Sequence, residues 1–341
     1  MTKFGRMAAG LLMAALLVGG AGALEVGDAA PGFELPTWLV GEPVNPGASD
    51  GKSVYLVQFW MIPCPACDEA SAKLNLLHKQ FFDQGLRIVA VNAEDEATTR
   101  ERLEVYQNEF PSALDPEGVA FKPYMHIDGR DKYPHAFLVG RDGQILWIGN
   151  PLEDDLERMI RGALDGTFTV EQAKAVADAR RILEEAGKLG DPGAITAALE
   201  KLMEVDTANP QWPMFLHRIA MQTGRPDLAE KALERWKTGF NDDADVQVNL
   251  AAVLMTMELS DRDPVGAAAA ARRALALDAE KTQFSSLAAV QALLAIGLIE
   301  EADKVLAVWK GENEEMKTEV QPDIDMMREY IEKLRQARAT E

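Results

Sequence analysis

Two cysteines, Cys64 and Cys67, are the only ones in the 341-residue chain, and they lie three positions apart. A nearly continuous apolar run of strand length, residues 54–60, comes just before them. A segment with helical periodicity, about residues 67–82, follows them. A pair at this junction places Cys64 beside the free backbone N–H groups of a helix start, where a thiolate is stabilised. We therefore expect the chain to fold around a strand–turn–helix unit that carries a redox-capable cysteine pair.

The first 23 residues have the pattern of a secretory signal peptide. Lys3 and Arg6 precede an apolar run at 7–18, and the small residues 21–23 form an A-x-A cleavage site. An uncleaved membrane anchor is the alternative, but the run is short for a span and a cleavage signal follows it directly. We expect an exported chain that is periplasmic or extracellular after cleavage, with no stable membrane insertion.

The charge of the chain excludes some partners and leaves the role of the cysteines open. Its 35 Lys and Arg against 55 Asp and Glu give a formal net charge of −20, which argues against nucleic acid or anionic lipid as a partner. In an oxidising compartment, one C-x-x-C pair forms either a structural disulfide or a working one. The working disulfide is favoured, because so short a loop stabilises a fold little through chain entropy.

Residues 24–167 alternate short strand and helix patterns, as an α/β domain does. Apolar strands are expected at 54–60 and 86–91, with helices at about 97–108 and 153–164. Two further strands, 133–139 and 144–148, flank a Gly-Arg-Asp-Gly turn and predict a hairpin.

Four motifs in order give this region its family resemblance: GDAAPGFELP, F-W-x-x-x-C-x-x-C, LRIVAVNA and YPHAFLVGRDGQILWIG. Together they resemble the thioredoxin-fold proteins of the TlpA-like disulfide reductase group, over residues 24–167. The resemblance implies an α/β thioredoxin-like fold, a central mixed sheet flanked by helices. It also implies a protein disulfide substrate, an upstream thiol electron donor and no cofactor besides the redox-active disulfide Cys64–Cys67.

Cys64 is the predicted attacking sulfur, and Cys67 is predicted to resolve the mixed disulfide. The resemblance implies a cis Pro134 opposite the pair, with Tyr133 and Pro65 as substrate contacts. A trans proline that starts an edge strand is the alternative for Pro134. A zinc site is not expected, since two cysteines and four scattered histidines offer no second ligand pair at metal spacing.

Three residues depart from the pattern of the family, and they put proton handling in doubt. Pro63 replaces the usual Trp before the first cysteine, Gln58 stands where thioredoxins carry a buried Asp, and Ala70 stands where many TlpA-like reductases have Glu. Water or Glu94 is then a candidate proton carrier. A peroxiredoxin is not expected, because Met61 occupies the position before Cys64 that would hold Thr or Ser.

Residues 168–341 have helical patterns only, and they repeat. Alanines at a similar place in four segments, spaced 35, 38 and 35 residues apart, approach the 34-residue tetratricopeptide period. The helices are expected to pair as 171–187 with 192–204, 209–222 with 226–238, 243–258 with 264–277, and 282–295 with 298–310, before a capping helix at 323–338. We expect an all-α tetratricopeptide-like domain; an irregular helical bundle is the alternative.

The predicted organisation is a signal peptide (1–23), a thioredoxin-like domain (24–167) and a helical repeat domain (168–341). The predicted function is that of an exported thiol:disulfide oxidoreductase that reduces protein disulfides by dithiol–disulfide exchange. Its repeats would recruit a protein partner or substrate. The alternative is a redox-linked holdase or scaffold whose main activity lies in the helical repeats.

Overall fold

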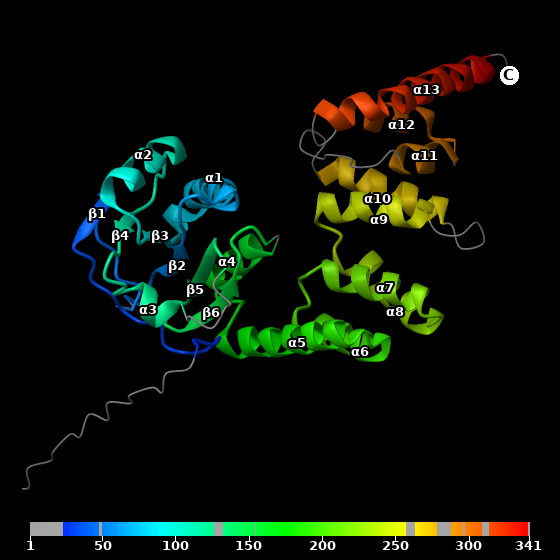
Figure 1. Cartoon of the computed structure of the whole chain (residues 1–341). Coiled ribbons are helices and arrows are strands. Elements are labelled where there is room, and N and C mark those ends of the chain that lie inside the picture. Colours follow the sequence, from blue (N-terminus) through cyan, green and yellow to red (C-terminus); the bar gives the residue numbers. More distant parts are fainter. Residues whose placement is uncertain are drawn as a thin grey trace, which may run out of the picture. The chain divides into compact units, whose positions relative to one another are not determined.

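The computed structural model describes residues 23–47, 50–125, 132–153, 155–256, 263–277, 288–295, 297–308 and 314–339. It divides into two compact units, residues 1–177 and 178–341. Figure 1 shows the first unit as a sheet with helices and the second as helices only. The domain boundary expected at 167/168 stays a prediction, and the signal peptide at 1–23 falls almost wholly outside the described residues.

The described residues of the first unit form one sheet of six strands in the order β1-β4-β3-β2-β5-β6. The strands are β1 (Thr37–Val40), β2 (Val54–Phe59), β3 (Leu86–Asn92), β4 (Ser112–Leu114), β5 (His135–Val139) and β6 (Ile145–Gly149). Strands β2, β3 and β4 run parallel, while β1, β5 and β6 pair antiparallel to their neighbours. The sheet is therefore mixed, as predicted. Strand β1 was not predicted, because its four residues are only half-buried and carry no alternating apolar pattern.

The register of β2 decides which segments meet at one end of the sheet. Phe59, its last residue, pairs with Val91 of parallel β3 and with His135 of antiparallel β5. The chain that leaves β2, the chain that leaves β3 and the chain that enters β5 therefore lie at the same end. This end carries the cysteine pair.

Helices and one 3-10 helix complete the described part of the first unit, and those near 67–82, 97–108 and 153–164 lie close to the ranges expected from the sequence. They are α1 (Pro65–Phe81), η1 (Phe82–Gln84), α2 (Glu96–Tyr106), α3 (Phe121–Tyr124) and α4 (Leu156–Asp165). Asp95 is the N-cap of α2, and its carboxylate accepts a hydrogen bond from the Thr98 amide at 3.0 Å. The turn into β3 ends at Gly85, whose φ of +108° favours glycine.

One face of the sheet is buried under the N-terminal segment and α3. Alternate residues of the central strands point to this face, as strand geometry requires: Tyr55, Val57, Phe59, Val89, Val91, Phe137 and Val139. Phe33 and Tyr124 pack against them, and the Tyr124 hydroxyl donates to the Pro31 carbonyl at 2.9 Å. Helices α1 and α4 contact β3 and β2. Strand β2 is buried along its whole length.

The second unit consists of helices, and most begin and end within three residues of the predicted ranges. They are α5 (Val170–Leu189, which starts in the first unit), α6 (Pro192–Val205), α7 (Gln211–Gln222), α8 (Pro226–Gly239), α9 (Ala244–Thr256), α10 (Pro264–Leu277), α11 (Ala288–Ala295), α12 (Ile299–Val308) and α13 (Glu314–Ala339). Helix α13 begins nine residues before the predicted capping helix, so Pro322 lies inside it. Residues 282–287 of one predicted helix lie outside the described part of the chain.

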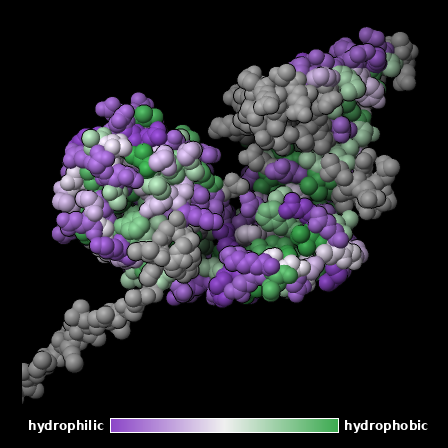
Figure 2. All heavy atoms as spheres, in the orientation of Figure 1, coloured by the Kyte–Doolittle hydropathy of each residue, from purple (hydrophilic) through white to green (hydrophobic). Residues whose placement is uncertain are grey.

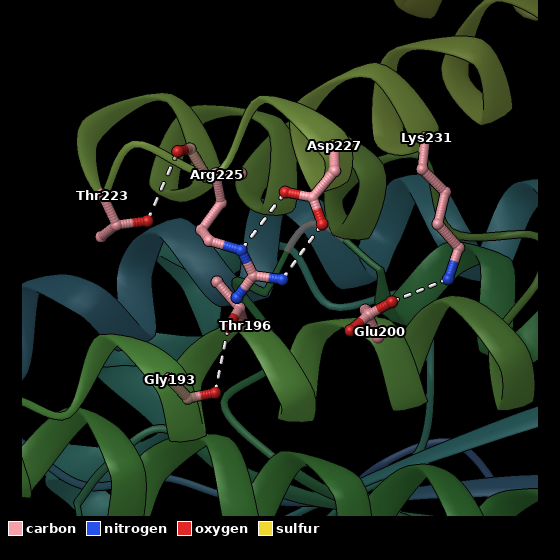
Figure 3. A network of polar contacts seen from close by, with 8 residues as sticks. Gly193, Thr196, Glu200, Thr223, Arg225, Asp227 and Lys231 are labelled. Carbon is pink, nitrogen blue, oxygen red and sulfur yellow. Dashed lines mark hydrogen bonds and ion pairs between the residues drawn. The ribbon is translucent and has the colours of Figure 1, made fainter.

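Successive helices of this unit pack on one another through small residues. The repeated alanines Ala229, Ala267 and Ala302 are buried, at 3%, 0% and 0% exposure, and Ala194 is half-buried. Figure 3 shows polar contacts around α6 and α8, where Lys231 donates to Glu200 at 2.7 Å and Arg225 pairs with Asp227. The arrangement is helix-rich with periodic packing, and its tetratricopeptide identity stays a prediction.

The surface of the first unit is mainly hydrophilic in the view of Figure 2, with smaller hydrophobic areas between the hydrophilic residues. Among the helices of the described ranges, none is long and apolar enough to cross a membrane.

His78, in the last turn of α1, couples the stability of the first unit to pH. Its ring packs against Phe82 and Phe110, at 5.0 and 6.0 Å between ring centroids. Burial, supported by the charge of Arg87 and opposed by that of Glu109, lowers the pKa of His78 below its usual 6.5. The folded state therefore binds this proton less readily than the unfolded chain does, and stability falls as the pH drops through about 6.5.

We expect His78→Gln to flatten the loss of thermal stability of the first unit between about pH 7.5 and pH 5.5. The measurement is the unfolding midpoint of both proteins across that range, each referred to its own value at the upper pH. Parallel profiles for wild type and variant would contradict the role assigned to His78.

Candidate active site

Cys64 and Cys67 form a disulfide at the first turn of α1, with 5.2 Å between their Cα atoms. Cys64 is the N-cap: its Sγ accepts a hydrogen bond from the Cys67 amide at 3.1 Å. Cys67 is fully buried, whereas Cys64 keeps 9% of its surface exposed. The sulfur beside the helix N-terminus therefore belongs to Cys64, which is the cysteine that solvent can reach. This is the arrangement expected for an attacking Cys64.

Pro134 and Tyr133 enter β5 next to the end of β2. The Tyr133–Pro134 peptide bond is cis, which confirms the expected geometry. Pro134 is buried and Tyr133 is half-buried. Because His135 pairs with Phe59, this proline lies at the same end of the sheet as the cysteine pair. The part of these two residues in substrate binding stays a prediction.

Tyr133 is positioned through α3. Its ring stacks on Phe121, with 6.4 Å between centroids and 24° between planes. Phe121 is fixed in turn by Asp115, whose buried carboxylate accepts hydrogen bonds from the amides of Val119, Ala120 and Phe121 at 2.6 to 2.9 Å. Asp115 was not among the residues predicted from the sequence, although Asp-Pro-Glu-Gly before a short helix is a turn and cap signal.

The loop around the cysteines is apolar. Pro63 and Pro65 are exposed, and Met61 and Ile62 are half-buried. Pro65, a predicted substrate contact, is the first residue of α1 and is accessible there. The Ile62–Pro63 bond is also cis, which was not predicted.

Gln58 and Ala70, the two positions that lack the carboxylate of the family pattern, are both buried. Glu94 was named as a candidate proton carrier only from its position in a loop, and it contacts the cysteine loop directly. Its Oε1 accepts a hydrogen bond from the Ile62 amide at 3.4 Å. It is therefore a carboxylate in contact with the cysteine loop, and its role as a proton carrier stays a prediction.

Asn92, at the end of β3, joins three segments around the site. Its amide group donates to the Trp60 carbonyl at 3.3 Å, and its Oδ1 accepts from the Glu94 amide at 2.7 Å and the Thr99 hydroxyl at 3.0 Å. With 1% of its surface exposed, Asn92 fixes the start of the cysteine loop against α2. Nothing local in the sequence marks it, because its partners are 32 and 7 residues away or belong to the next loop.

Tyr106, in the last turn of α2, contacts residues on both sides of the cysteine pair. Its ring packs on Trp60 at 5.2 Å between centroids, and its hydroxyl donates to Asp68 Oδ1 at 2.6 Å. Burial, and then the hydrogen bond to Asp68, raise the pKa of Tyr106 well above its usual value. The phenol therefore stays protonated and remains a donor at physiological pH.

Within the described part of the chain, no three His, Cys, Asp or Glu side chains come together as a possible metal site. His126, one of the four histidines, lies outside that part. The absence of a metal therefore stays a prediction.

Comparison with known proteins places the matched region in the first unit. The model of the AhpC/TSA family matches residues 26–148. The thiol-disulfide oxidoreductase ResA of Geobacillus kaustophilus is 30% identical over 139 residues, 40% of this chain and 76% of the relative. Protein FixW of Rhizobium leguminosarum is 30% identical over 154 residues, 42% of this chain and 69% of the relative. A crystal structure of a DsbE-type thiol:disulfide interchange protein from Chlorobium tepidum aligns over 43% of this chain and 100% of its own, at 26% identity and a TM-score of 0.36.

We expect Asn92→Ala to lower the free energy of unfolding of the first unit by about 1–3 kcal/mol, because it leaves buried polar groups without partners. Urea denaturation measures this, and Gln84→Ala, which removes an exposed amide from η1, is the matched control with a change within about 0.5 kcal/mol. Equal, small changes for both variants would show that Asn92 does not hold the loop.

Proposed function

Because the chain belongs to the AhpC/TSA family and, with ResA, to its thiol-disulfide oxidoreductases, we propose that it reduces protein disulfides by dithiol–disulfide exchange. One observation carries the proposal: the disulfide lies at a helix N-terminus, where Cys64 keeps 9% of its surface exposed and Cys67 is fully buried. That asymmetry supports Cys64 as the attacking sulfur and Cys67 as the resolving one.

In the proposed reaction, the reduced enzyme meets a disulfide of the substrate. The Cys64 thiolate attacks one substrate sulfur, the substrate S–S bond breaks, and the other substrate sulfur leaves as a thiolate that takes a proton. Cys67, once deprotonated, attacks Cys64 Sγ and releases the first substrate sulfur, also as a thiolate. Two electrons have then passed to the substrate, and the enzyme holds the Cys64–Cys67 disulfide. An upstream dithiol donor has to reduce that disulfide before the next turnover.

The environment of Cys64 supports both steps. The Cys67 amide donates to Cys64 Sγ, and the free N–H groups of the first turn of α1 stabilise negative charge there. Apart from Glu94, at the Ile62 amide, the neighbouring loop residues are apolar. A carboxylate at that position is suited to accept the Cys67 proton directly or through water.

Tyr133, Pro134 and Pro65 are the proposed substrate contacts. An extended substrate segment would lie along the chain entering β5, with an apolar neighbour of its cysteine on Pro65 and Tyr133. The stacking of Tyr133 on Phe121, which Asp115 holds through α3, supports this, because it presents a fixed surface to the substrate. This arrangement and the motif pattern together favour a TlpA-like reductase.

We also propose that the chain acts outside the cytoplasm and that its second unit recruits a protein partner or substrate. The signal pattern at 1–23 supports export. The succession of packed helices, with buried alanines at a period near 35 residues, supports a tetratricopeptide-like array with a binding face. The aromatic candidates for a partner contact are Trp212, Phe215, Trp236 and Trp309. Trp212 and Trp236 are buried and belong to the helix packing, whereas Phe215 is half-buried and remains a candidate; Trp309 lies outside the described residues.

We expect the protein to reduce insulin in the presence of dithiothreitol, Cys64→Ser to abolish this activity, and Cys67→Ser to accumulate a mixed disulfide between Cys64 and the substrate. Turbidity follows the reduction, and non-reducing electrophoresis with mass spectrometry follows the intermediate. Glu69→Gln, a change on α1 next to the pair, is the control that should keep turnover within about twofold. Equal turnover by wild type and Cys64→Ser would rule out the proposed mechanism.

A further inference from the structure

Two side chains of α2 contact a solvent-exposed carboxylate that belongs to the cysteine helix. The Asp68 side chain accepts the Tyr106 hydroxyl on Oδ1 at 2.6 Å and lies 3.7 Å from Arg102 through Oδ2. The Arg102 guanidinium also lies over the Tyr106 ring, 5.6 Å from its centroid. The other face of this assembly is Trp60, on which Tyr106 packs. Both oxygens of Asp68 are thus engaged by side chains of a single neighbouring helix.

Asp68 is close to the reacting sulfurs along the chain. It directly follows Cys67, and its amide donates to the Cys64 carbonyl at 3.3 Å, so it lies in the first turn of α1. The free N–H groups of that turn stabilise a thiolate on Cys64. A carboxylate in the same turn has the opposite effect on a thiolate, by like-charge repulsion.

We propose that Tyr106 and Arg102 are positioning residues that hold and partly neutralise the Asp68 carboxylate, and thereby set the reduction potential of the Cys64–Cys67 couple. The inference deepens the proposed function and rests on it. This role explains why Asp68, a charged residue, lies beside a site whose other neighbours are mostly apolar. Among the described residues, no hydrogen bond joins Tyr106 or Arg102 to either sulfur; in this proposal they act through Asp68.

The sign of the effect follows from the redox step. The disulfide takes up two electrons, its S–S bond breaks, and above the pKa of Cys64 one proton is bound, by Cys67, while Cys64 remains a thiolate. Loss of the Tyr106 hydroxyl leaves the Asp68 charge less compensated, which destabilises that thiolate and favours the disulfide. The couple becomes more reducing. Neutralising Asp68 makes it more oxidising, for the same reason.

Other charges around the turn have to be separated from Asp68. Glu69 is the next residue of α1, and Glu94 reaches the Ile62 amide from the loop after β3. No hydrogen bond between Tyr106 and either residue is among the contacts of the described residues, so their effect on the couple should not depend on the Tyr106 hydroxyl. Glu69→Gln is therefore the matched control for Asp68→Asn: it removes the same charge one position along the same helix.

The test equilibrates the full-length protein with glutathione buffers at about pH 8, where a thiolate at a helix N-terminus is ionised. The proteins compared are wild type, Tyr106→Phe, Asp68→Asn, Glu69→Gln and the two double variants with Tyr106→Phe. Tyr106→Phe should shift the equilibrium constant about threefold toward the disulfide, which is about 14 mV for a two-electron couple. Asp68→Asn should shift it the other way, and Tyr106→Phe should add nothing in that background while keeping its full effect with Glu69→Gln. Because these charges are exposed to solvent, the shift should shrink at about 1 M salt.

An unchanged reduction potential in Tyr106→Phe overturns the proposal. An equal shift of the potential with and without Asp68 also overturns it, because the effect then comes from packing on Trp60. A shift that persists unchanged in high salt overturns it as well. The potential is measured without any protein substrate, so a failure to reduce insulin would leave this result standing, and a failure here would leave the insulin assay standing.

Discussion

The structure depends on how strand β2 ends. Its six residues are wholly buried at the centre of the sheet, and its last residue pairs with β3 on one side and β5 on the other. The chain that leaves it turns directly into α1 through the cysteine pair. Because burial fixes the strand and the pairing fixes its end, the disulfide, the N-terminus of α1 and the cis proline that enters β5 lie at one edge of the sheet.

Three polar residues around this edge hold the cysteine loop and the neighbouring helices in place. Asn92 ties the start of the loop to β3 and α2, Asp115 holds α3 beneath Tyr133, and Tyr106 reaches across both sides of the cysteine pair. Each is a buried or half-buried polar group with hydrogen-bond partners in neighbouring elements. The geometry of the loop therefore depends on the rest of the fold. In the proposed reaction Cys64 and Cys67 carry out the thiol chemistry, and we propose that these neighbours influence the stability of the Cys64 thiolate and the surface that a substrate contacts.

The local parts of the fold and site could be predicted from the sequence. Apolar strands, the cysteine helix and the helical half follow from periodicity, and the cis Pro134 followed from a family resemblance. Strand β1, the cis bond before Pro63 and the roles of Asn92 and Tyr106 could not. Asn92 and Tyr106 each have a partner more than 30 residues away, Trp60 for the first and Asp68 for the second, and no spacing rule predicts such contacts before the chain is folded. Glu94 was proposed only from its position in a loop, and its hydrogen bond with the Ile62 amide shows that it lies beside the cysteine loop.

The proposed mechanism requires Cys64 to be the reactive thiolate and Cys67 the protected partner. Competitive alkylation of the reduced protein by iodoacetamide across a pH series, with peptide mapping, tests it most directly. We expect Cys64 to be modified first, with a midpoint well below the usual thiol value of about 8.5, and Cys67 to be modified slowly at every pH. Equal rates at both cysteines, or faster modification of Cys67, would contradict it.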